Sequence, residues 1–251
     1  MTGLLDRRIA LVTGGMRGLG RAIATAFAEA GAMGIVLDQP VVVTADAAPS
    51  GFEAIAGDVT AEDDLAAAMR RVTERYGRLD VVVANAGLVP PWRETTALDL
   101  DEWDRVMAVN VRGVAATLKH AAPALAAHGG SIIAMASINA FVAHAQQMAY
   151  TASKHAVLGM VRAAARDLGR HGIRVNALAP GPIATDALLE RIRLRARSGP
   201  SEAEALDGLA RGTALERLAT ADEVAKAALF LASDLSSGIT GVLLPVDAGL
   251  L

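Results

Sequence analysis

The 251-residue sequence predicts a single-domain α/β fold over residues 1–251, a doubly wound parallel sheet with helices on both faces. Short apolar runs rich in Val, Ile and Leu alternate along the chain with longer stretches of helical period. The runs are apolar at consecutive positions, which is typical of strands buried on both sides. Repeated strand–helix–strand units form right-handed crossovers, which place helices on the two faces of one sheet.

Six runs are predicted to be strands, and they comprise residues 9–12, 34–37, 79–83, 131–135, 173–177 and 242–246. A further strand is expected to end just before Asp58. The run at 79–83 is then the fourth strand and the run at 131–135 the fifth.

Five stretches are predicted to be helices, at residues 21–30, 61–76, 101–127, 152–169 and 221–232. Asp222 and Glu223 suit the first turn of the last helix, next to the positive end of its dipole. Residues 39–57 show no amphipathic helix, so the crossover there is expected to be short. The charged stretch 184–215 fits neither period, and we expect residues 184–212 to form a mobile substrate lid.

The composition excludes several classes of function. Hydrophobic residues make up 53 % of the chain and aromatic residues 3 %, so the core is expected to be aliphatic. The formal charge of -3 gives no basic excess for binding a nucleic acid. The absence of cysteine rules out thiolate catalysis and cysteine-ligated metals. Neither a signal peptide nor a bilayer-spanning stretch is recognisable, so we expect a cytoplasmic protein without a membrane partner.

A glycine-rich loop follows the first predicted strand and opens the first helix. It covers residues 13–20 and contains Gly14, Arg17, Gly18, Leu19 and Gly20. Glycine permits a tight turn and a close approach of backbone to a pyrophosphate, while the helix N-terminus offers free N–H groups. No Gly-Lys-Ser/Thr follows, so the loop is not a triphosphate-binding P-loop. The alternative is a tight strand–helix turn without a ligand.

Three further segments lie at strand ends, where open α/β sheets bind ligands. Asp38 ends the second strand, where an acid can bind the ribose of a dinucleotide, but it also suits an ordinary turn. Asp58 follows the third strand and is alternatively a helix N-cap. The segment Asn85-Ala86-Gly87 ends the fourth strand and is alternatively a simple turn, since Asn and Gly tolerate positive φ.

Tyr150 and Lys154 are four residues apart at a helix start and therefore share one face. A nearby ammonium stabilises phenolate and lowers the pKa of a tyrosine, which suits acid–base chemistry. Ser137, just after the fifth strand, can donate a hydrogen bond to a substrate oxygen. Such a Tyr/Lys pair on its own is usually a solvated helix face. The position of all three residues at the carboxyl ends of strands favours the catalytic interpretation.

Taken together, these motifs resemble those of a classical short-chain dehydrogenase/reductase over essentially the whole chain. The matching residues are the 13–20 loop, Asp58-Val59, Asn85-Ala86-Gly87, Asn110, Ser137, Tyr150-Thr151-Ala152-Ser153-Lys154, Asn176, Pro180-Gly181-Pro182-Ile183-Ala184-Thr185 and the closing stretch 241–247. Each motif is modest by itself, but their joint occurrence in this order is highly specific. The resemblance implies a Rossmann-type fold.

The resemblance also implies catalytic roles for four residues. Tyr150 would be the general acid or base, and Lys154 would hold the nicotinamide ribose hydroxyls and lower the pKa of Tyr150. Ser137 would orient and polarise the substrate oxygen. Asn110 would support a helix kink and a water in a proton relay.

For the cofactor, the resemblance implies a larger set of contacts. It comprises the loop residues and Asp38 named above together with Asp58, Val59, Asn85, Ala86, Gly87, Tyr150, Lys154, Pro180, Gly181, Ile183 and Thr185. Asp58 and Val59 would contact adenine, while Ile183 and Thr185 would hold the carboxamide.

Three features depart from the family pattern. The crossover at 39–57 is short, Ala84 stands where the family often has a second Asn, and Asp247-Ala248-Gly249 replaces a common Asp-Gly-Gly. The short crossover bears on the adenine pocket and not on the catalytic residues.

His144 and Gln146 lie between Ser137 and Tyr150, in a segment that borders the substrate pocket in this family. They are candidate substrate contacts, with a plain surface loop as the alternative. We expect packing roles for Trp92 and Trp103. The run Arg191, Arg193, Arg195 and Arg197 is expected to form a solvated face, and the remaining histidines show no metal-ligand spacing.

The resulting hypothesis is an NAD-dependent enzyme that moves hydride between nicotinamide and a largely apolar secondary alcohol or ketone. Asp38 favours NAD by repelling a 2′-phosphate, against Arg17, which could attract one. We expect a homotetramer, from the resemblance and from Ala-rich helices at 101–127 and 152–169. A non-enzymatic dinucleotide sensor or scaffold is the main alternative. An extended-type epimerase or dehydratase is the second alternative, but it resembles longer chains.

Overall fold

The computed structural model describes residues 3–43, 48–195 and 199–250. The predicted fold class is confirmed, because these residues contain one parallel sheet in the order β3-β2-β1-β4-β5-β6-β7. The strands are β1 (Ile9–Thr13), β2 (Met33–Asp38), β3 (Phe52–Ala56), β4 (Val81–Ala84), β5 (Gly130–Met135), β6 (Ile173–Pro180) and β7 (Leu243–Val246).

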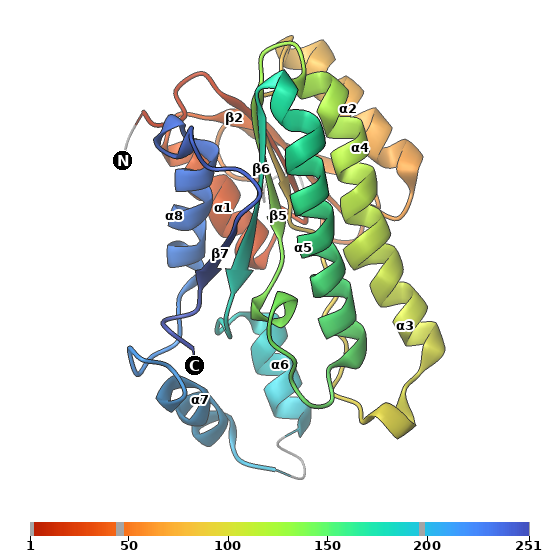
Figure 1. The fold of residues 1–251 in the computed structure, drawn as a ribbon, viewed down its shortest axis with the longest axis vertical. Helices are drawn as coiled ribbons and strands as arrows, with labels where there is room; N and C mark the ends of the chain where they lie inside the picture. Colours follow the sequence, from red (N-terminus) through yellow and green to blue (C-terminus); the bar gives the residue numbers. More distant parts are fainter. Residues whose placement is uncertain (1–2, 44–47, 196–198, 251) are drawn as a thin grey trace.

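Helices cover both faces of the sheet (Figure 1). One face carries α2 (Glu62–Tyr76), α4 (Gly113–Leu125) and α5 (Met148–Leu168), and the other carries α1 (Gly18–Glu29) and α8 (Ala221–Ala232). The remaining helices are α3 (Leu100–Met107), α6 (Asp186–Arg195) and α7 (Glu202–Arg211). Figure 1 shows α6 and α7 beyond the ends of β6 and β7 to which the strand arrows point.

The sheet separates two aliphatic cores, which explains why its central strands are apolar throughout. Ile9 and Leu11 of β1 pack into the core under α2, α4 and α5. Ala10 and Val12 of the same strand pack into the core under α1 and α8. Successive residues of a strand point to opposite faces, so burial on both sides requires an apolar residue at every position.

The direction of strand progression reverses between β1 and β4. From β1 the chain proceeds to β2 and β3 on one side, whereas β4 begins the series that proceeds to β7 on the other. The loops that leave β1 and β4 therefore diverge at this point, at the carboxyl edge of the sheet. Open α/β sheets bind ligands at such a switch point.

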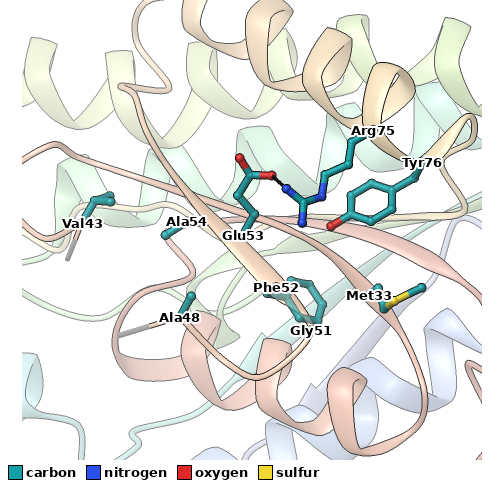
Figure 2. A pocket seen from close by; sticks show the side chains of 9 residues that line it. All are labelled: Met33, Val43, Ala48, Gly51, Phe52, Glu53, Ala54, Arg75 and Tyr76. Carbon is teal, nitrogen blue, oxygen red and sulfur yellow. Dashed lines mark hydrogen bonds and ion pairs between the residues drawn. The ribbon is translucent and has the colours of Figure 1, made fainter. Parts of the chain in front are cut away.

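The crossover from β2 to β3 is short, as predicted, and no helix occurs in its described residues. The apolar run Val41-Val42-Val43 adds no strand, since Val41 and Val42 lie in a turn with Pro40. A hollow of about 560 Å³ lies beside the amino ends of β2 and β3, and Figure 2 shows the Glu53–Arg75 ion pair at its rim. This hollow is at the opposite edge of the sheet from the switch point.

Two helical predictions need correction. The predicted helix at 101–127 is interrupted by a π-helical turn, Ala108–Arg112, between α3 and α4. The stretch 184–215 was expected to be irregular, but it contains α6 and α7; residues 196–198 lie outside the described part. A capping box of Ser201 and Glu204 starts α7, and Asp207 pairs with Arg211 along it. Both interactions stabilise α7, which has no buried residue.

None of the helices in the described part of the chain is long and apolar enough to cross a membrane. The described residues also contain no group of three or more His, Asp or Glu side chains that could hold a metal ion.

Candidate active site

The glycine loop between β1 and α1 leaves no room for a side chain at Gly14 or Gly20. Gly14 has φ 63°, and a Cβ atom there would lie 3.0 Å from Cα of Ala86. A Cβ atom at Gly20 would overlap the carbonyl oxygen of Gly14. Gly18 has φ 54°, and no atom of the described residues lies within 4 Å of its Cβ position. The loop is therefore packed tightly against the protein at its ends and open at Gly18.

Asp38, at the end of β2, holds this loop in place. Its Oδ2 accepts a hydrogen bond from the backbone N–H of Met16 at 3.0 Å, and its Oδ1 accepts one from Gln39 at 2.9 Å. The carboxylate is buried, with 8 % of the residue exposed. Arg17, the residue before α1, is exposed.

The loops after β1 and β4 are joined by Thr13 and Asn85. Oγ1 of Thr13 accepts the backbone N–H groups of Asn85 at 3.0 Å and Ala86 at 3.1 Å. In return, the Asn85 amide donates to the carbonyls of Thr13 at 2.9 Å and Gly14 at 3.0 Å. These four hydrogen bonds fix the two loops against each other across the switch point. Thr13 was not singled out from the sequence, and its position at the last residue of β1 was the available signal.

Asp58 and Val59 follow β3 next to this site. Oδ1 of Asp58 accepts the N–H and the hydroxyl of Thr60, both at 2.8 Å, so it stabilises a turn before α2 and is not the N-cap of that helix, which is Ala61. Val59 packs against Gly113, where a Cβ atom would lie 2.9 Å from Cγ2 of Val59. The role of both residues toward adenine stays a prediction.

The residues at this edge fit a dinucleotide. A side chain at Gly18 would fill the open surface of the loop, and the first turn of α1 has no side-chain cap within the described residues. Its N–H groups can therefore bind an anion such as a pyrophosphate. The Asp38 carboxylate lies beside the same loop, where ribose hydroxyls can donate to it.

Ser137, Tyr150 and Lys154 come together beyond the ends of β5 and β6. Ser137 follows β5 and is buried, while Tyr150 and Lys154 share one face of the first two turns of α5. Oγ of Ser137 accepts the backbone N–H of Asn139 at 3.2 Å, and Ser137 also acts to lower the pKa of Tyr150. Nζ of Lys154 lies 5.5 Å from the centre of the Tyr150 ring and donates to the carbonyl of Met135 at 2.7 Å.

Burial has the largest effect on the pKa values of Tyr150 and Lys154. Burial raises the pKa of Tyr150 above its usual value, while the hydrogen bond with Ser137 and the charge of Arg191 act in the opposite direction. Burial lowers the pKa of Lys154 to about 8. At neutral pH the chain therefore holds a protonated phenol beside an ammonium group that titrates close to the working pH.

Asn110 occupies the π-helical turn between α3 and α4 and is fully buried. Its Oδ1 accepts the N–H of Leu88 at 2.7 Å, and its Nδ2 donates to the Leu88 carbonyl at 2.8 Å and to Oγ of Ser153 at 3.1 Å. A Cβ atom at Gly87 would lie 3.5 Å from Oδ1 of Asn110 and 3.7 Å from Nζ of Lys154. Asn110 thus joins the loop after β4 to α5 beside the lysine.

The stretch after β6 leads from the sheet into α6. The N–H of Gly181 donates to Val246 at 3.1 Å, and a Cβ atom at Gly181 would lie 2.8 Å from that of Asp247. Ile183 is buried and forms an isolated bridge with Ala219. The carbonyl of Thr185 accepts the N–H of Leu189 in the first turn of α6. Pro180 ends β6, so the predicted carboxamide contacts follow its carboxyl end directly.

The predicted substrate contacts lie in the segment before α5. Gln146 has φ 65°, and its side chain donates to Glu94 at 3.4 Å in an exposed contact. His144 is half-buried, and its Nε2 has no hydrogen-bond partner among the described residues. Both substrate roles stay predictions.

The surroundings of Arg191 and Trp92 differ from those predicted. Arg191 does not form part of a solvated face, because its guanidinium Cζ lies 4.0 Å from the centre of the Trp92 ring and its Nε is buried. Trp92 therefore stacks with a cation. Arg193 is exposed and pairs with Glu202 at 2.7 Å, as a solvated residue would. Arg197 lies outside the described residues, and the surroundings of the Arg195 side chain are likewise not described.

The sequence matches a family model described as enoyl-(acyl carrier protein) reductase over residues 14–251. Short-chain dehydrogenase reductase 3a of Arabidopsis thaliana is 41 % identical over 258 residues, which cover 99 % of this chain and 97 % of that protein.

Two solved structures are also similar. Ligand-free aldohexose dehydrogenase of Thermoplasma acidophilum is 31 % identical with a TM-score of 0.90, covering 100 % of this chain and 96 % of that one. Carveol dehydrogenase of Mycobacterium avium, solved in complex with NAD, is 31 % identical with a TM-score of 0.90, covering 99 % of each chain. The likeness therefore extends over nearly the whole chain, in sequence and in fold.

Proposed function

The chain belongs to the short-chain dehydrogenase/reductase family of pyridine-nucleotide oxidoreductases, and we propose that it is an NAD-dependent enzyme acting on a secondary alcohol or ketone. The observation that carries this proposal is the grouping of Ser137, Tyr150 and Lys154 at the carboxyl edge of the sheet. The glycine loop and Asp38 lie at the same edge.

NAD is proposed over NADP because of Asp38. Its carboxylate is buried and accepts two backbone N–H groups, so it is held in place beside the glycine loop. A 2′-phosphate placed there would meet this negative charge, whereas ribose hydroxyls can donate to it. Arg17 is exposed at the start of α1 and is free of such a constraint within the described structure. The carveol dehydrogenase complex with NAD agrees with this choice.

The bound cofactor supplies or accepts the hydride. The protein manages the proton: the phenol of Tyr150 donates it to a carbonyl oxygen, or takes it from an alcohol in the reverse direction. The Ser137 hydroxyl, which acts on the Tyr150 phenol, donates to the same substrate oxygen. The ammonium of Lys154 favours the phenolate that remains, and Asn110 positions the neighbouring loop.

The substrate is proposed to be a largely apolar small molecule. The pocket is expected to be built by the segments 138–148 and 184–212, where Phe141, Val142 and Met148 are exposed apolar residues. The two solved relatives are named for aldohexose and carveol, so their shared fold does not decide the substrate. The segment 184–212 is further proposed to act as a lid over this pocket.

The test is an absorbance assay at the reduced-nicotinamide band. Purified protein is given NAD with a panel of secondary alcohols, and NADH with ketones and with enoyl thioesters. Turnover of alcohols or ketones supports the proposal. Turnover of enoyl thioesters alone would instead favour the activity in the family model's description. Cofactor binding without turnover of any compound would favour the sensor or scaffold.

We also propose a homotetramer. The support from the chain is the small-residue surface of α5, where Gly159 is exposed and has no neighbour within 4 Å of its Cβ position among the described residues. Small residues let helices of two copies approach closely. Light scattering at micromolar concentration tests this, and a monomer would contradict it.

A further inference from the structure

Two buried side-chain nitrogens in the described structure have no hydrogen-bond partner: Nε of Arg191 and Nε2 of His144. Both belong to segments that flank Tyr150. His144 precedes α5, and the charge of Arg191 in α6 acts on the Tyr150 phenol. Buried polar atoms are nearly always hydrogen-bonded, so an unpartnered pair beside a catalytic residue requires an explanation.

Arg191 is held in a defined orientation. Its guanidinium stacks on Trp92, with Cζ 4.0 Å from the ring centre. A guanidinium that stacks through its flat face keeps its N–H edge available for hydrogen bonds in the plane. Arg193, two residues later on the same helix, is exposed and donates from Nε to Glu202 at 2.7 Å. α6 therefore directs one arginine inward and another outward.

Among the described residues, the guanidinium of Arg191 also has no counter-ion. Within the described residues no carboxylate lies within ion-pair distance of it, whereas Arg93, Arg193 and Arg217 each pair with a glutamate. Arginine remains charged even when half-buried. The group that matches a planar guanidinium edge is a carboxylate, which accepts two parallel hydrogen bonds.

We propose that Arg191 binds a carboxylate of the substrate, which is therefore an oxo- or hydroxy-carboxylate with an otherwise apolar body. Nε and one Nη would donate to the two carboxylate oxygens. His144, in the segment before α5, provides a second buried nitrogen without a partner among the described residues. This inference rests on the function proposed above and adds the chemical group that the enzyme recognises.

The test compares acids with their uncharged esters. The probes are meta- and para-acetylbenzoate and the methyl ester of each, given to wild type, Arg191→Gln and Arg193→Gln. Calorimetric titration in the presence of oxidised NAD measures affinity without turnover, because a ketone cannot react with the oxidised cofactor. With NADH, kcat/KM is measured for each acid and ester.

Wild type is expected to prefer at least one acid over its ester by about tenfold to a hundredfold, in both affinity and kcat/KM. Arg191→Gln should remove the preference and leave the ester and the cofactor bound as in wild type. Arg193→Gln makes the same change of charge on the outer face of α6 and should retain the preference.

Equal binding of acid and ester by wild type, binding of neither, or a preference that survives Arg191→Gln would overturn the inference. Turnover of ketones without any acid preference would overturn the inference and leave the proposed function intact. Tight, Arg191-dependent binding of an acid without turnover of any carbonyl compound would support carboxylate binding by Arg191 and contradict the proposed function.

Discussion

The carboxylate of Asp38 accepts the backbone N–H of Met16 at 3.0 Å, so the acid that ends β2 fixes the loop that leaves β1. Its other oxygen accepts the N–H of Gln39. A carboxylate restrained in this way cannot easily turn aside, and its charge stays at the place where a dinucleotide ribose would lie. Asp38 therefore holds the loop in place, and in the proposed function the same carboxylate also favours NAD.

Asp38→Ser should remove most of the preference for NAD, while wild type should prefer NAD by at least about tenfold. Asp38→Asn separates the two effects, since it removes the charge and keeps an acceptor for the Met16 N–H. The measurement is the ratio of kcat/KM for NAD and NADP. Adding Arg17→Ala to Asp38→Ser should then weaken use of NADP. A wild-type ratio that favours NADP would show that Arg17 dominates.

Tyr150→Phe should lower kcat by at least about 10²-fold, because it removes the proton donor and keeps the ring. The cofactor dissociation constant, measured by NADH fluorescence, should stay close to the wild-type value. Turnover within a few-fold of wild type would mean that another group transfers the proton.

Thr13→Val should destabilise the fold by about 2–4 kcal/mol, because two backbone N–H groups at Asn85 and Ala86 lose their acceptor. It should also weaken cofactor binding, since the loops after β1 and β4 lose part of their connection. Thr13→Ser keeps the hydroxyl and should cost about 1 kcal/mol or less. Urea unfolding of the three proteins checks this, and a loss in Thr13→Val no larger than in Thr13→Ser would contradict the stabilising role of the hydroxyl.

Burial of Lys154 predicts a pH-dependent stability of the cofactor-free protein. Its pKa is about 8 when folded and near 10.5 when unfolded, so the unfolded chain binds more protons between these values. Stability therefore rises with pH in this range. Between about pH 7 and about pH 9, wild type should gain about 1 kcal/mol relative to Lys154→Met. Parallel urea unfolding at the two pH values measures this, and a constant difference would show that the folded pKa is not lowered.

The proposed lid predicts slower hydrogen exchange in α6 and α7 when cofactor and an unreactive substrate analogue are both bound. Exchange in α2, on the far side of the molecule from the lid, serves as the internal control. If α6 and α7 exchange at the same rate in the free and the ternary states, they form a static surface.

Much of the sheet and of the candidate site could be predicted, because strand ends and glycine turns carry local signals. Asp38, Ser137 and Tyr150 each lie within or directly beyond an element whose period or motif marks it. The helices α6 and α7 were not predicted from the sequence; α7 has no buried residue, and its first turn carries a capping box.

The inward orientation of Arg191 is a tertiary property. Arg191 and Arg193 look alike in a charged run, and only the packing of α6 against Trp92 distinguishes them. The break at Ala108–Arg112 does not follow from the period of residues 101–127, but the family resemblance implied a helix kink at Asn110, which lies in this turn.

The hydrogen bond between Thr13 and Asn85 joins residues that are 72 positions apart. Most strand pairings in the sheet, in contrast, connect strands that follow one another in the chain. During refolding, β1–β3 and β4–β7 can each assemble through nearer contacts before the longer loop closes. The loops after β1 and β4, where we propose that the cofactor binds, come together only after these two halves have docked. The ability to bind the coenzyme should therefore appear late in the folding time course, after most of the secondary structure has formed.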